Sequence, residues 1–297
     1  MKTTDDGKIR ASSSGLGLLE PSGAAASSEV PESAGAGALI INADDWGRDR
    51  DTTDRTLDCI RCATVSSVSA MVFMEDSERA AAKAVDHKIS VGLHLNFTTP
   101  FSASGVASRL AEHQQRLTRH LRRHRLAPVV YHPALSSSFD YVVKAQLDEF
   151  CRLYGVNPER IDGHHHMHLC ANVIFGKLLP AGTIVRRNFS FRAGEKGLAN
   201  RLYRNSIDRI IRRRHDTTDY MFALPPLNPP DRLQRIFAMA RQFSVEVETH
   251  PVDVAEYAYL TQGEVVRQAE DVPIATSYTL SRRASQSPHN QADDRRT

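Results

Sequence analysis

Short apolar runs alternate with helical patterns along most of this chain, and this alternation limits the possible folds more than any other feature. We expect strands at 38–41, 65–73, 89–95, 160–164, 183–187, 220–224 and 245–249. Between them, the apolar spacing predicts helices at 53–63, 76–85, 108–125, 139–154, 173–179, 196–214 and 231–243. Alternation of this kind indicates an α/β fold with a parallel sheet, open or closed into a barrel.

The predicted strands are apolar almost throughout, which is typical of parallel strands covered on both faces. In barrels of this class, reactive groups gather at the carboxyl ends of the strands. The polar clusters of this sequence follow the predicted strands directly. This coincidence is the first indication of function.

The two ends of the chain differ from its middle in composition. Residues 1–37 are dominated by Ser, Ala, Gly, Glu and Pro, and 282–297 are similarly polar. Such segments bury too little apolar surface to offset chain entropy, so we expect a disordered leader and a flexible tail. The sequence therefore predicts one domain, at 38–281.

The charge balance excludes some classes of partner. The chain has 38 basic and 35 acidic residues, a net charge of +3, which does not call for a nucleic-acid or membrane partner. Two basic segments, 109–125 and 201–214, read as solvated helix faces, and a nucleic-acid surface is the alternative. The sequence shows no secretory signal and no apolar run long enough to cross a bilayer. We therefore expect a cytoplasmic protein.

Asp44 and Asp45 follow the first predicted strand directly. Adjacent carboxylates repel one another unless a cation or a shared proton offsets their charge. One interpretation is a turn that caps the next helix. The other is a functional pair, in which one carboxylate binds a metal and the other acts on a reacting water.

Histidines follow three other predicted strands. His94 ends the third strand, and His250 ends the last one, just before a proline. The run 162–168 holds an aspartate and four histidines, and in an extended segment alternation would place His164, His166 and His168 on one side. So many imidazoles are unusual in a core because each needs hydrogen-bond partners. An exposed histidine-rich loop is the alternative.

One carboxylate and two imidazoles leave coordination positions open for water and substrate, as in catalytic metal centres. A bound metal lowers the pKa of water and polarises a carbonyl oxygen. A second carboxylate can then accept the proton of the water, and a histidine can protonate the leaving group. Together these residue types indicate a metal-dependent hydrolase.

At these residues the chain resembles the YdjC/ChbG/HpnK family of carbohydrate deacetylases. The resemblance covers about residues 38–280, and its motifs lie in the order of the family. They are Ile41-Asn42-Ala43-Asp44-Asp45-Trp46-Gly47, Val91-Gly92-Leu93-His94-Leu95-Asn96, Ile161-Asp162-Gly163-His164-His165-His166-Met167-His168 and Glu248-Thr249-His250-Pro251.

The resemblance implies a distorted (β/α) barrel that removes acetyl groups from N-acetylated sugars or oligosaccharides with a divalent metal, magnesium or alternatively zinc. Carried over by position, Asp45, His94 and His164 would be the metal ligands. Asp44 would be the general base and His250 the general acid. Whether the protein forms a homodimer stays open.

The resemblance also implies roles for residues around this centre. His166 and His168 would support the ligands or contact the substrate, and Arg186 stands where the family often has an arginine near the site. Trp46 replaces the usual phenylalanine and would alter the wall of the sugar site. The loop 97–101 lacks the usual glycine, so its shape should differ. Hydrolysis of another bond, such as a phosphoester or another acylated amine, and non-catalytic sugar binding are the alternative functions.

Overall fold

The computed structural model describes residues 37–191, 195–278 and 280. The described strands are β1 (Ala38–Trp46), β2 (Ser67–Ala70), β3 (Val91–Leu95), β4 (Arg160–Gly163), β5 (Ile184–Val185), β6 (Tyr220–Ala223) and β7 (Ser244–Thr249). The described α-helices are α1 (Arg50–Arg61), α2 (Ser77–Asp86), α3 (Ser108–Leu121), α4 (Ser136–Tyr154), α5 (Ala171–Phe175), α6 (Leu198–Ile211), α7 (Asp231–Met239), α8 (Val254–Thr261) and α9 (Glu264–Ala269). Three 3-10 turns are η1 (Ala127–Val129), η2 (Pro133–Leu135) and η3 (His164–Leu169). The expected leader and tail lie outside the described residues, except Gly37.

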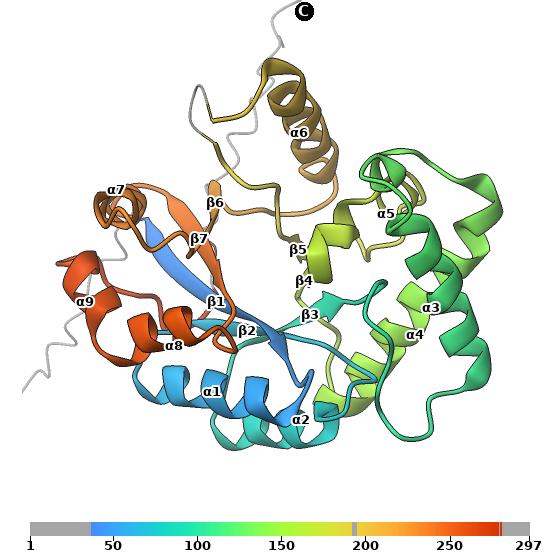
Figure 1. Cartoon of the computed structure of the whole chain (residues 1–297), viewed down its shortest axis with the longest axis horizontal. Coiled ribbons are helices and arrows are strands. Elements are labelled where there is room, and N and C mark those ends of the chain that lie inside the picture. Colours follow the sequence, from blue (N-terminus) through green and yellow to red (C-terminus); the bar gives the residue numbers. More distant parts are fainter. Residues whose placement is uncertain (1–36, 192–194, 279, 281–297) are drawn as a thin grey trace, which may run out of the picture. The chain divides into compact units, whose positions relative to one another are not determined.

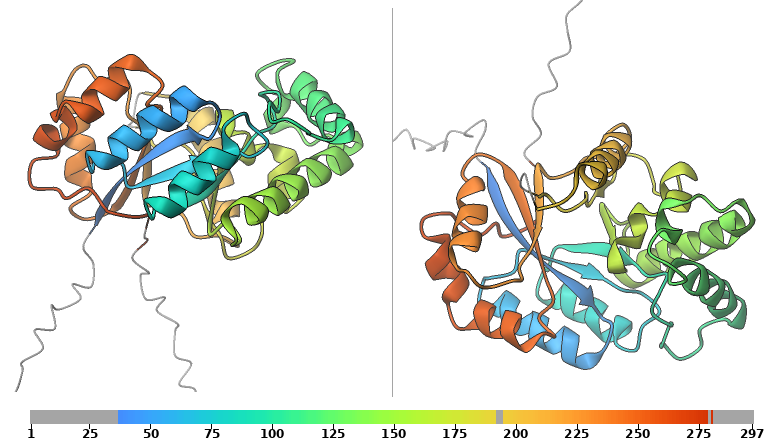
Figure 2. Two further views of the ribbon diagram at one scale, coloured as in Figure 1. Left: turned by 90° about the horizontal axis from the view of Figure 1, so that it is seen from below. Right: turned by 45° about the horizontal axis from the view of Figure 1, so that its top comes forward.

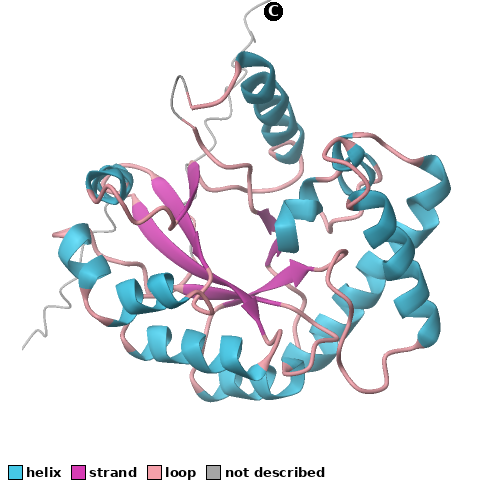
Figure 3. Ribbon diagram, in the orientation of Figure 1, coloured by secondary structure: helices cyan, strands magenta, loops and turns pink. Residues whose placement is uncertain are grey.

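The strands form one seven-stranded sheet in the order β5-β4-β3-β2-β1-β7-β6, and each neighbouring pair is parallel. This is the strand order of a (β/α) barrel that is open between β5 and β6. The sheet curls, and the helices lie outside it (Figure 3). The predicted distorted barrel is therefore confirmed.

The two faces of the curled sheet carry different residues. The outward face is apolar and packs against the helices, as Val245 and Val247 of β7 do. The inward face is polar, because Glu246 and Glu248 of the same strand point into the barrel and reach a buried arginine. Both faces are buried, as expected, but only the outward face is apolar. The alternation of valine and glutamate in β7 was the visible sign of this in the sequence.

A glycine makes room for one of the buried charges. A Cβ at Gly92 of β3 would lie 2.6 Å from the guanidinium carbon of Arg160 on β4. That guanidinium donates to Ser69 and Asp162, and the ring of Tyr278 lies 4.5 Å from it. At this level of the barrel, side chains of neighbouring strands thus meet in the interior.

The helices confirm the predicted alternation, with three differences. Most ends differ by a few residues, and α5 is shorter than the predicted helix. The helices α8 and α9 were not predicted. Finally, α6 stands away from the curled sheet on the side of β5 and β6, whereas α1 and α2 lie along it (Figures 1 and 2).

Candidate metal centre

A bulge at the end of β1 brings two neighbouring carboxylates to one histidine. The register between β1 and β2 shifts between Ala43 and Trp46, and Asp45 has a φ of 62°. Neighbouring residues of a regular strand would point to opposite faces. Here Asp44 Oδ2 lies 4.0 Å from His94 Nδ1, and Asp45 Oδ1 lies 3.3 Å from His94 Nε2. Aspartate tolerates this left-handed conformation better than most residues do.

Asp45, His94 and His164 could hold a metal ion. One ligand atom of each lies within 4.8 Å of the others. Asp45 Oδ1 is 2.9 Å from His164 Nδ1 and 3.3 Å from His94 Nε2. Atoms bound to one cation at about 2.0–2.2 Å are separated by about 3 Å, so these distances fit. Asp45 Oδ1 and His94 Nε2 are buried and lack a hydrogen-bond partner within the described chain, which also fits a cation.

Further contacts fix the orientation of these groups. His94 and Asp162 are paired across β3 and β4, and His94 Nδ1 lies 2.7 Å from Asp162 Oδ1. A proton shared there leaves the lone pair of Nε2 facing Asp45. The second oxygen of Asp45 accepts a hydrogen bond of 2.7 Å from Arg48, which also binds Asp49. Asp45 and His94 are therefore each oriented by a contact made through the side-chain atom that does not face the other residue.

Arg186 is fully buried among four carboxylates. It donates to both oxygens of Asp44, each at 2.7 Å, and to Glu246 at 2.8 Å. Glu248 and Asp162 lie 3.3 Å and 3.1 Å from it. Burial opposes the charge of the guanidinium, but the surrounding carboxylates, Asp162 and Asp44 above all, raise the pKa of Arg186 well above its ordinary value. Arg186 thus lies beside Asp44, at the position where the resemblance places an arginine.

Asp44 is held as an oriented anion. Besides the two bonds from Arg186, its Oδ1 accepts a hydrogen bond of 2.8 Å from Asn42. Burial alone would raise the pKa of this carboxyl, but Arg186, and to a smaller extent His94, keep it below its ordinary value. The second possible metal group, Asp44, His94 and Asp162, fits less well, because both aspartates are occupied by arginines.

The histidine run is not extended, which corrects the prediction. Residues 164–169 form η3, and His165 and His166 both have left-handed backbone angles, φ 54° and 56°. The imidazoles consequently point in different directions. His165 Nδ1 lies 2.9 Å from the Thr98 hydroxyl, and His166 Nε2 lies 3.4 Å from Glu248. The alternation that the sequence suggested is lost because the strand ends at Gly163.

Two other histidines differ in exposure. His168 is fully buried, and its Nε2 donates to the backbone carbonyl of Arg186 at 2.9 Å. Burial lowers the pKa of His168 to about 3. His250 is half-buried, and its backbone amide donates to Glu256. It follows Thr249, which pairs with Ala43, so it leaves the sheet at the level of Asp44.

Trp46 lies in the hydrophobic core and has no exposed surface. Any effect of this residue on a sugar site would therefore be indirect, through the bulge that precedes it.

Sequence reasoning overlooked several residues of this cluster. Asp162 and Glu248 stood in the family motifs but received no role, and Glu246 was read only as part of a strand. The sequence did contain a sign of these residues, because charged and apolar residues alternate with a period of two in strands that must be buried. Arg48 had no comparable signal, since a single arginine just before a predicted helix indicates no particular partner.

Fold and centre together define a class: a curled parallel (β/α) barrel with carboxylates and imidazoles clustered at the carboxyl ends of its strands. The model of the YdjC-like protein family matches residues 38–282. The chain belongs to this family, as its motifs predicted.

Individual relatives agree with this assignment. A chitooligosaccharide deacetylase of Proteus mirabilis is 30% identical over 145 residues, which cover 44% of this chain and 50% of the relative. A carbohydrate deacetylase of Geobacillus stearothermophilus is 31% identical over 135 residues, covering 45% and 51%. The chain thus spans about half the length of these curated relatives. One crystal structure shares the fold, with a TM-score of 0.58 and 17% identity. It is of an Enterococcus faecalis protein provisionally assigned to cellobiose-phosphate cleavage, and the match covers 82% of this chain and 97% of that chain.

Proposed function

We propose that this protein is a metal-dependent hydrolase that removes acetyl groups from N-acetylated sugars. The observation that carries the proposal is the convergence of Asp45, His94 and His164 beside a second carboxylate, Asp44. Membership of a family whose curated relatives are named as carbohydrate deacetylases supports the substrate class.

In this proposal Asp45, His94 and His164 hold a divalent cation. When bound there, such a cation would lower the pKa of a water and polarise the carbonyl oxygen of the acetyl group. Two imidazole nitrogens are ligands that zinc accepts readily, whereas magnesium prefers oxygen, so both metals belong in the test.

Asp44 is the general base. It accepts the proton of the attacking water, and Arg186 keeps it ionised and fixes its direction. His250, at the same edge of the sheet, donates a proton to the nitrogen of the departing amine. Glu248 lies beside Arg186, and His166 lies beside Glu248, where it would contact the sugar.

The test is acetate release from N-acetylglucosamine oligomers by the full chain, stripped with a chelator and reloaded with Mg²⁺ or Zn²⁺. Asp44→Asn should keep the metal and lose turnover by about 10²- to 10⁴-fold, the range of a general base. His94→Ala and His164→Ala should lose both metal and turnover. His87→Ala, at the exposed end of α2, is the matched control and should change neither.

Three outcomes would contradict the proposal in different ways. An active Asp44→Asn variant would exclude the assigned base. Release of phosphate from sugar phosphates, without release of acetate, would indicate a different hydrolase. Sugar binding without turnover at any metal concentration would indicate a binding protein.

A further inference from the structure

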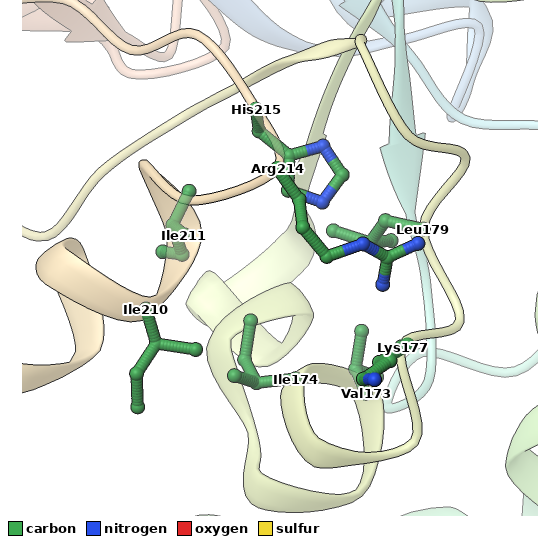
Figure 4. Close-up of a pocket in the computed structure, with 8 residues that line it drawn as sticks. All are labelled: Val173, Ile174, Lys177, Leu179, Ile210, Ile211, Arg214 and His215. Carbon is green, nitrogen blue, oxygen red and sulfur yellow. The ribbon is translucent and has the colours of Figure 1, made fainter.

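The helix α6 has one face packed and one face free. Its residues Ile207 and Ile211 are buried. Figure 4 shows Ile210 and Ile211 opposite Val173 and Ile174 of α5, around a cavity of about 20 Å³. These contacts fasten the carboxyl-terminal half of α6 to the rest of the domain.

The opposite face of α6 exposes large apolar side chains. Successive residues of a helix are rotated by about 100°, so Leu198 and Leu202 lie on the side away from Ile207. Leu198 is 70% exposed and Leu202 is 57% exposed. Two leucines one turn apart, both in solvent, have no explanation in the packing of the domain.

The same region carries positive charge without matching acids. Arg201, Arg209, Arg212, Arg213 and Arg214 are all exposed. None of them forms an ion pair within the part of the chain that the structure describes. The one acid of this segment, Asp208, is buried and bound by Arg187.

We propose that this face of α6, defined by Leu198, Leu202, Arg201 and Arg209, binds an anionic lipid surface. Exposed leucines on a helix lined with arginines are typical of a helix that lies in the membrane interface. The leucines would insert among the lipid headgroups, and the guanidinium groups would bind the lipid phosphates. Among the described residues, no helix combines the length and apolarity needed to cross a bilayer. The contact is therefore with the surface.

The neighbouring surface combines aromatic rings with charged side chains. Lys196, just before α6, lines a cavity of about 710 Å³ whose walls include four aromatic rings. These rings belong to Phe189, Phe191, Tyr220 and Phe222.

A nucleic acid would use the arginines but leave Leu198 and Leu202 without a role, so lipid fits the whole face better.

This inference differs from the expectation, drawn from the sequence, that no membrane is involved. That expectation rested on the net charge of the whole chain, +3, which averages over regions. The structure shows that the positive charge of α6 is gathered on one exposed segment. The inference does not depend on the proposed hydrolase activity.

The experiment is co-sedimentation of the full chain with vesicles of phosphatidylcholine, alone or mixed with phosphatidylglycerol. We expect binding only to the anionic vesicles, weakened by salt. The double variant Arg201→Ala and Arg209→Ala should lower the partition coefficient by about 25-fold, at roughly fivefold per arginine. The double variant Leu198→Ser and Leu202→Ser should lower it by about tenfold.

Matched controls lie elsewhere on the surface. Val85→Ser removes an apolar side chain that is 68% exposed on α2, and Arg116→Ala together with Arg119→Ala removes two exposed charges from α3. These variants should bind anionic vesicles as the wild type does. All variants should release acetate from soluble sugars at the wild-type rate. A failure of the lipid-binding inference can therefore be distinguished from a failure of the proposed activity.

Several results would overturn the inference. These are equal binding to neutral and anionic vesicles, no binding to either, or losses in the control variants as large as those in α6. Tighter binding to duplex DNA than to vesicles would assign the face to nucleic acid. A dimer in solution that the leucine variants dissociate would assign it to a second copy of the chain.

Discussion

Two groups of arginines in this molecule have opposite surroundings. Arg186 is fully buried, and four carboxylates surround its guanidinium. Arg201 and Arg209 of α6 are exposed and have no acidic partner among the described residues. The first arrangement fixes the geometry of the candidate site inside the protein, whereas the second leaves charge available for another molecule. The number of arginines in a sequence therefore indicates less about their function than the acidic residues that the fold places around them.

The two regions also differ in how much of their structure is fixed in advance. Around Arg186 nearly every oxygen has a donor, so the positions of Asp44 and Asp162 are determined before any substrate arrives. Preorganised charges of this kind stabilise a reaction without reorganisation at the moment it occurs. On α6 the guanidinium groups of Arg201 and Arg209 are exposed and form no ion pair among the described residues, so they can reorient. The predictions below test this contrast.

The largest effect on stability should follow from Arg186→Met. Removal of the guanidinium leaves Asp44, Glu246 and Glu248 buried without their main counter-charge. We expect the free energy of unfolding to fall by about 3–5 kcal/mol, as when one partner of a buried ion pair is removed. Urea denaturation with a chelator present measures the loss without a contribution from bound metal.

The neighbouring arginine is the matched control for this measurement. Arg187 binds a single carboxylate, Asp208, at 2.8 Å, and 13% of its side chain is exposed. Arg187→Met should therefore cost clearly less than Arg186→Met. Equal losses would show that the four carboxylates do not depend on Arg186, and the contrast between the two groups of arginines would fail.

A smaller effect, on metal affinity, should follow from Asp162→Asn. Ser69, Arg160 and Arg186 all lie near Oδ2 of Asp162. The amide oxygen of asparagine would turn to these donors, and its NH₂ group would face His94 Nδ1. This selects the tautomer with the proton on Nε2, the nitrogen that should bind the metal. We expect metal affinity to fall by about 10- to 100-fold, measured by competition with a chromogenic chelator.

Asp208→Asn serves as the control for this variant. Asp208 is also buried and bound to an arginine, but its partners Arg187 and Asn188 are not part of the metal group. It should lower stability and leave metal affinity unchanged. If Asp162→Asn binds metal as tightly as the wild type, Asp162 does not set the tautomer of His94.

The strand pattern and the three candidate ligands were accessible from the sequence for a common reason. Parallel strands of a barrel end at one edge, so polar residues that follow them must come close together whatever the details of packing. Asp45, His94 and His164 each follow this rule. Arg186 was named only because the resemblance places an arginine there, and its four acidic neighbours were not foreseen.

The remaining details depend on partners that are distant in sequence. The bulge at Asp45 exists only against β2, and the left-handed turn at His165 follows from where β4 ends. The direction of α6 could not be read from its residues, because its pattern predicts a helix but not what the helix packs against. The unpredicted helix α8 is apolar on more than one side, so it showed no clear periodicity in the sequence.

The smallest effect should come from the free face of α6. Leu198→Ser and Leu202→Ser remove side chains that are 70% and 57% exposed, so each should change the free energy of unfolding by less than about 0.5 kcal/mol. Ile207→Ser, on the packed face of the same helix, should cost about 2–5 kcal/mol because it empties a buried site. Urea denaturation of the three variants measures the difference between the faces. If the leucine variants are as destabilised as Ile207→Ser, α6 packs through its leucine face, and that face is not free for a lipid surface.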